Sequence, residues 1–154
     1  MCIHEISRTI TLEARAEGVP QFFVSDPLLF SQRILEGRIA QFKNVSDTNS
    51  PYIIYDRGIP DILAYMDSVG RPYGREFTDA CRKFIYDQVF LLPPWEEIYI
   101  PDNERYENFG EALVIHDFLE RTYKKYGYRA IEVPIGTVDQ RVGFIMKILN
   151  EDNV

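Results

Sequence analysis

The chain has 154 residues, the length of one ordinary domain, and 45% of them are hydrophobic and 27% charged, which excludes a disordered, collagen-like or coiled-coil protein. The net charge of −7 argues against a nucleic-acid-binding protein, because binding to phosphates needs clustered Lys and Arg. No apolar run approaches the ~18 residues of a membrane span and no secretory signal opens the chain, so we expect a cytoplasmic protein without a membrane partner.

The first half of the chain predicts a helix, a strand and a second helix. Asp26 and Pro27 are a typical capping residue and first-turn residue, and apolar residues then recur at helical spacing to about residue 43. The continuous apolar run 52–55 is typical of a strand buried on both faces of a parallel sheet. Gly58 and Pro60 end this strand and open the next helix.

The second half repeats this order. It predicts a strand at 89–92, a polar loop at 101–108, a helix at 109–126 and a strand at 130–133. Thr137 and Gln140 have capping-box spacing, and they predict a last helix whose apolar face carries Val138, Val142, Ile145 and Leu149. Because strands alternate with helices, we expect a single α/β domain over residues 1–154 with a mostly parallel sheet.

Candidate site residues are those that follow the strands, because ligands of parallel sheets bind at the carboxyl ends of the strands. Asp56 and Arg57 follow the strand at 52–55; the carboxylate suits Mg²⁺ or a general base, and the guanidinium suits a phosphate. Asp56 as a helix cap and Arg57 as a surface residue remain the alternative. Arg105 lies in a polar loop, where it is either a lid arginine or a solvated residue.

Other patterns carry less information about function. Glu5 and Arg8 have the spacing of a helical surface ion pair. Cys2 and Cys81 lie far apart and are expected to be reduced thiols, and no His/Cys cluster has the spacing of a zinc site. The sequence contains neither a GxGxxG nor a GxxxxGK[ST] motif.

Several segments occur in an order that is typical of one family: EISR at 5–8, YDRGIPDILAYMD at 55–67, VFLLPPWEEIY at 89–99, DNERYENF at 102–109, GYRAIEVP at 127–134 and VDQRVGFI at 138–145. In these segments the chain resembles the AAA-type predicted ATPases of the P-loop NTPase superfamily, which are relatives of the nicotinamide riboside kinase domain of bacterial NAD regulators. The resemblance covers nearly the whole chain and implies a doubly wound parallel sheet that binds ATP with Mg²⁺.

The resemblance also implies roles for individual residues. Asp56 resembles the acidic residue near Mg²⁺ and the acceptor, and Arg57 and Arg105 resemble arginines that face the phosphates. The turn that holds Pro134, Gly136 and Val138 resembles the segment beside the adenine. The residues expected to face a small-molecule or protein acceptor are Glu5, Arg8 and Asp61.

In this family a strand, a phosphate loop and a helix precede the segment that matches EISR, whereas here Met1 stands just before it. We therefore expect a P-loop ATPase or small-molecule kinase domain that lacks about 25–30 residues of its first strand, loop and helix, and so binds ATP weakly. The alternatives are a noncatalytic, P-loop-less interaction module and, less favoured, a metal-independent enzyme that uses Asp56 on another substrate.

Overall fold

The computed structural model describes residues 1–19, 22–45, 49–99 and 108–151. Contacts between Cα atoms divide the chain into two compact units, residues 1–85 and 86–154. Each unit is described by itself below. In the part of the chain described, no helix is long and apolar enough to cross a membrane.

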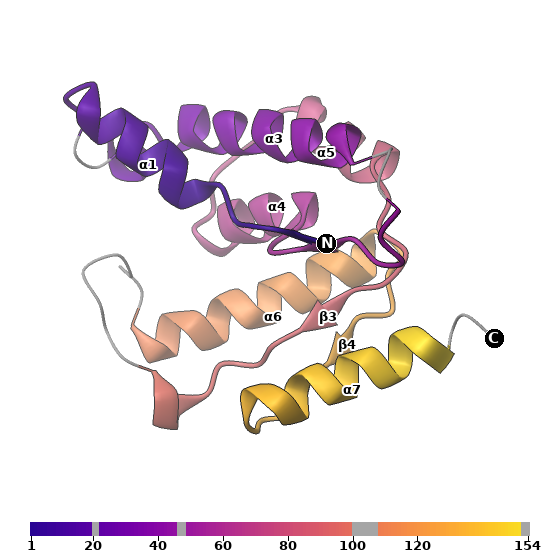
Figure 1. The fold of residues 1–154 in the computed structure, drawn as a ribbon. Coiled ribbons are helices and arrows are strands. Elements are labelled where there is room, and N and C mark those ends of the chain that lie inside the picture. Colours follow the sequence, from indigo (N-terminus) through magenta and orange to yellow (C-terminus); the bar gives the residue numbers. More distant parts are fainter. Residues whose placement is uncertain (20–21, 46–48, 100–107, 152–154) are drawn as a thin grey trace. The chain divides into compact units, whose positions relative to one another are not determined.

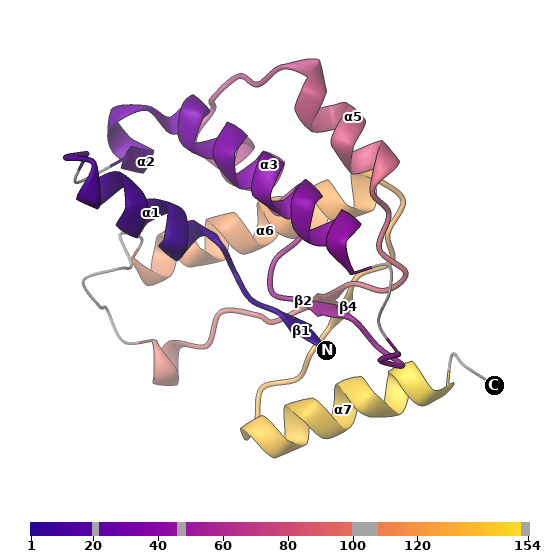
Figure 2. The same ribbon diagram turned by 45° about the horizontal axis from the view of Figure 1, so that its top comes forward.

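The first unit is mostly helical and contains one pair of parallel strands. Strand β1 (Cys2–Ile3) pairs with β2 (Ile54–Tyr55), and Ile54 N and Asp56 N donate to Met1 O and Ile3 O at 2.9 and 2.8 Å. The two strands run together in Figure 2. The helices are α1 (Ser7–Ala16), α2 (Phe22–Ser25), α3 (Pro27–Asn44), α4 (Ile59–Ser68) and α5 (Arg75–Lys83).

Helix α3 is the element against which α1 and α4 lie (Figure 1). It begins as predicted, because the Asp26 carboxylate accepts a hydrogen bond from Leu29 N at 3.0 Å and Pro27 needs no donor in the first turn. The core of the unit lies on α4 and α5, where the most buried large side chains are Ile59, Leu63 and Phe77.

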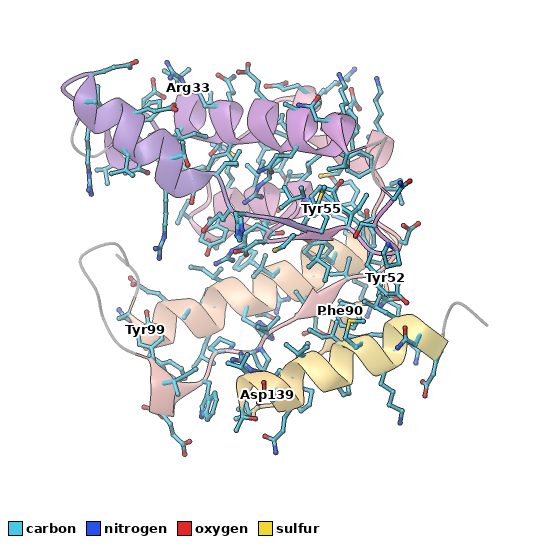
Figure 3. The ribbon with its side chains drawn as sticks, viewed as in Figure 1. Arg33, Tyr52, Tyr55, Phe90, Tyr99 and Asp139 are labelled. Carbon is cyan, nitrogen blue, oxygen red and sulfur yellow. The ribbon has the colours of Figure 1, made fainter. Side chains whose placement is uncertain are left out.

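Aromatic side chains connect the end of α3 to β2 and to the residue after α5. The ring of Phe42 stacks on Tyr55 with centroids 5.9 Å apart and meets Phe84 edge-on at 5.4 Å. Figure 3 marks Tyr55 on β2 and Tyr52 just before it. Partial burial of the Tyr55 hydroxyl raises its pKa above the ordinary value of 10.0, because the ionised phenolate loses solvation there.

The second unit has its own parallel pair and two long helices. Its elements are β3 (Phe90–Leu91), a short 3₁₀ turn η1 (Glu96–Ile98), α6 (Phe109–Lys125), β4 (Ile131–Glu132) and α7 (Val138–Glu151). Ile131 N and Val133 N donate to Val89 O and Leu91 O, which sets the register of β3 and β4. The predicted box at α7 is present: Thr137 N donates to Gln140 Oε1 at 2.9 Å, and Gln140 N donates to Thr137 Oγ1 at 3.3 Å.

The α/β class and the parallel pairing are thus confirmed, and the four predicted helices correspond to α3, α4, α6 and α7. The extent of the strands was predicted wrongly: the run 52–55 forms a strand only at residues 54–55, and Ile54 is 46% exposed instead of buried. In the described residues each sheet has two strands, so β2 has a neighbour on one side only. The doubly wound arrangement stays a prediction.

Two helical expectations also differ from the structure. Three helices, α1, α2 and the amphipathic α5, were not predicted. Val138 and Val142, expected on a core-facing side of α7, are 64% and 52% exposed. Capping and periodicity specify where a helix forms, but which side is covered depends on residues far away in sequence.

Candidate functional site

The candidate site of the first unit is built where β2 ends. The backbone of Asp56 belongs to the strand ladder, since its N–H donates to Ile3 O at 2.8 Å, while its side chain is exposed. The next residue, Arg57, has a φ of 78°, which lies in the left-handed region that non-glycine residues rarely adopt. Backbone strain of this kind is concentrated at functional sites. The strand therefore presents a carboxylate and a guanidinium in succession from a held backbone.

Asp61 ties this turn to the start of α4. Its Oδ2 accepts a hydrogen bond from Gly58 N at 2.9 Å, and its Oδ1 lies 3.8 Å from Arg57 Nη1. The Asp61 side chain is only 9% exposed, whereas that of Arg57 is 37% exposed. Asp61 is thus committed to a backbone amide and to Arg57 in this structure.

Arg57 is surrounded by groups that favour its charged form. Desolvation alone lowers the pKa of Arg57, but the charges of Tyr65, Asp61, Glu5 and Asp56 outweigh it and raise the pKa above the ordinary arginine value. At neutral pH the tyrosine is uncharged, so the carboxylates provide the attraction and the Tyr65 ring provides a cation–π contact at 6.0 Å. Arg57 is therefore permanently cationic, and it is exposed enough to meet an anion.

Glu5 and Arg8 lie at the start of α1 in the same unit. The helix begins at Ser7, so Glu5 precedes it, and its carboxylate accepts a hydrogen bond from the Ser7 hydroxyl at 2.6 Å. Arg8 is exposed in the first turn. Glu5 is among the carboxylates whose charge raises the pKa of Arg57, so the EISR segment and the DRG turn lie near one another.

The remaining predicted residues are in the second unit or outside the described residues. Pro134 and Val138 are exposed and Gly136 is half-buried, and they flank the capped start of α7, near Asp139 in Figure 3. An added Cβ at Gly136 would lie 2.7 Å from Gln140 Oε1, so a larger residue would disturb the capping bond to Thr137 N. Arg105 lies outside the described residues.

Two contributors were missed by sequence reasoning. Tyr65 supplies the aromatic face for Arg57. Arg38 on α3 is buried, with 6% of its surface exposed, and its Nη1 donates to Gly58 O. The available signal for Arg38 was its position, because a lone arginine at the spacing of the buried Ile34 and Leu35 needs a polar partner in the interior.

The side chains of the candidate site suit Mg²⁺ better than they suit the triphosphate of ATP. Among the described residues, no three His, Cys, Asp or Glu side chains are grouped to hold a metal ion. Mg²⁺ in nucleotide sites often relies on one or two carboxylates together with substrate phosphates, and the exposed Asp56 suits that mode. A triphosphate ordinarily rests on the backbone amides and lysine of a GxxxxGK[ST] loop, and the sequence contains no such motif.

Comparison with known proteins places the chain in a family. The sequence profile of a family described as AAA domain matches residues 1–141. No curated protein and no solved structure matches the chain. The match covers the parallel strands, the Asp56–Arg57 turn and the start of α7. The chain therefore belongs to the AAA domain family, whose P-loop NTPase-like character indicates a nucleotide-binding function.

Proposed function

We propose that the chain is the acceptor-side and catalytic part of an ATP-dependent, small-molecule kinase-like domain with a doubly wound sheet. The observation that carries the proposal is the pairing of the family match with an exposed carboxylate, Asp56, at the carboxyl end of a parallel strand. Bound Mg-ATP would supply the phosphoryl group. Asp56 would hold the ion or the acceptor hydroxyl, and Arg57 would exchange its 3.8 Å contact with Asp61 for a phosphate oxygen.

The other site residues are assigned on the resemblance. Arg105 would act on the transferring group from its loop, and the turn that holds Pro134, Gly136 and Val138 would border the adenine. The acceptor side would be formed by Glu5, Arg8 and Asp61. Because the Asp61 side chain is buried, Asp61 would act on the acceptor indirectly, through Arg57. The acceptor is a small molecule or a protein side chain with a hydroxyl group.

The first test is titration calorimetry with Mg-ATP. Because the phosphate loop is absent from the sequence, the 154-residue chain should bind weakly. A version that carries a strand, a GxxxxGK[ST] loop and a helix ahead of Met1 should bind measurably. A dissociation constant in the low micromolar range for the 154-residue chain, about −8 kcal/mol, would refute the need for the loop.

The second test uses variants of the extended version. Arg105→Ala should lower kcat by roughly 10³-fold or more, as for other arginines that stabilise transferred phosphoryl groups, and should leave folding intact. Asp56→Asn should abolish turnover at nearly unchanged volume. Arg82→Ala is the control, because the Arg82 side chain is 69% exposed and pairs with Asp79 on the surface. Turnover within about threefold of the parent in both site variants, less than about 1 kcal/mol in barrier, contradicts the assignment.

A noncatalytic interaction module, the alternative that the sequence left open, is the second candidate. In that case the extended version shows no Mg-ATP turnover with any acceptor, and Asp56→Asn changes nothing that involves nucleotide. The turnover of the extended version and of its Asp56→Asn variant therefore separates the two functions.

A further inference from the structure

Both backbone polar groups of Gly58 are held by buried charged side chains from different helices. Gly58 N donates to Asp61 Oδ2 on α4 at 2.9 Å, and Gly58 O accepts from Arg38 Nη1 on α3. Each of these two side chains belongs to a residue that is 6% exposed. A neutral backbone carbonyl is an unusual reason to bury a guanidinium, because removing that charge from water is unfavourable.

Arg57, which lies between Asp56 and Gly58, has a strained backbone. On one side of Arg57 the strand ladder fixes Asp56 N to Ile3 O, and on the other side Gly58 is held at both its amide and its carbonyl. Arg57 spans the interval with a φ of 78°. A non-glycine residue adopts the left-handed conformation about 5- to 30-fold less often than the right-handed one. Contacts with neighbouring residues must therefore hold Arg57 in it.

We propose that Arg38 is a positioning residue, which holds the Gly58 carbonyl so that Arg57 keeps its left-handed backbone and the site presents Asp56 and Arg57 together. The consequence for phosphoryl transfer rests on the proposed function above. The backbone role does not, because it follows from the φ of Arg57 and from the contacts of Gly58, whose carbonyl also accepts from Asp61 N at 3.3 Å. Arg38 sits on the buried face of α3 at the spacing of Ile34 and Leu35, where packing alone favours an apolar side chain.

The test compares glycine with alanine at position 57. Both Arg57→Gly and Arg57→Ala remove the side chain, but only glycine adopts positive φ without strain, so the difference between them reports the backbone conformation. In the 154-residue chain, urea unfolding should give the glycine variant an unfolding equilibrium constant about 2-fold or more smaller than that of the alanine variant, because the greater freedom of glycine in the unfolded chain offsets part of the strain. Equal unfolding constants, or a more stable alanine variant, would show that residue 57 is not held at positive φ and would overturn the proposal.

The same comparison is then made with Arg38→Met, which keeps much of the apolar stem and removes the donor. The glycine advantage should vanish or reverse, since alanine is the more stable choice wherever φ is negative. Arg38→Lys retains a donor and should keep most of the advantage. An undiminished advantage with Arg38→Met, or a lysine variant that behaves like the methionine variant, contradicts a role for the donor.

Two controls separate this role from general support of the fold. Arg33→Met changes an exposed arginine of the same helix, marked in Figure 3, whose ring partner is Phe22 at 5.6 Å, and it should leave the glycine advantage unchanged. If Arg38→Met does not fold, Arg38→Leu, the residue type that packing alone favours at this buried position, replaces it in the comparison with the same expectation. Failure of both variants to fold shows that Arg38 supports the fold and overturns the proposal. None of these readouts involves ATP, so they stand or fall apart from the proposed function.

Discussion

Replacing Asp61 by alanine tests how strongly the Asp56–Arg57 turn is held. The substitution leaves Gly58 N–H in a buried position without its 2.9 Å acceptor, which costs about 1–3 kcal/mol. It also removes an acidic side chain from the first turn of α4, worth about 0.3–1 kcal/mol. We expect a loss of about 2–3 kcal/mol, which lowers the urea midpoint by roughly 1–1.5 M at a slope of about 2 kcal/mol/M.

Asparagine at the same position separates the hydrogen bond to Gly58 N from the effects of the negative charge. Asp61→Asn keeps an oxygen that can accept from Gly58 N and loses the ionic contact with Arg57. That contact is 3.8 Å long and involves a side chain that is 37% exposed, so its loss should cost about 1 kcal/mol or less. Asp79→Ala is the matched control, because its 3.5 Å pair with Arg82 lies on the surface and should matter by less than about 0.5 kcal/mol. Equal losses for the asparagine and alanine variants would refute the reasoning, as would a loss for alanine no larger than that of the control.

Two further measurements follow from the backbone and from the aromatic packing. Gly143→Ala in α7 should stabilise the chain by about 0.5–1 kcal/mol, because an added Cβ there meets nothing within 4 Å and alanine is the better helix former. Gly127→Ala, at a φ of +87°, should destabilise it by roughly 1–2 kcal/mol, and thermal unfolding that ranks the two variants the other way would contradict this account. For Tyr55, whose pKa is raised by burial, the neutral form stabilises the folded state fully below pH 10.0, and this contribution is lost as pH rises through the folded-state pKa. The free energy of unfolding of the parent should therefore fall more steeply above that pH than that of Tyr55→Phe, and parallel pH profiles would show that burial does not perturb the hydroxyl.

Local chemistry made four of the helices, α3, α4, α6 and α7, predictable from the sequence. Asp26 with Pro27 marks the start of α3, and Thr137 with Gln140 marks the start of α7, since both signals act over three or four residues. Helix α5 escaped prediction although it carries buried residues at helical spacing, Phe77, Ala80 and Cys81. It begins at Arg75, after the glycine- and proline-rich stretch 70–74, and no side chain caps its start.

The site was predictable only in part, because its geometry depends on long-range contacts. The position of Asp56 after a strand follows from the apolar run before it. The positive φ of Arg57 and the bond from Arg38 to the Gly58 carbonyl, 20 residues away, have no local signature. The same limit applies to the strands, since the number of residues that enter a ladder is set by the partner strand and not by the apolar run itself.

The brevity of the strands bears on where native-state hydrogen exchange will be slowest. In most parallel α/β domains the central strands hold the most protected amides, but here each described strand is two residues long and each ladder has one partner. In the first unit the deepest burial lies along α4, where Ile59, Leu63 and Ala64 are fully covered. Amide protons of α4 should therefore report the global opening of that unit, while those of β1 and β2 exchange through smaller local openings.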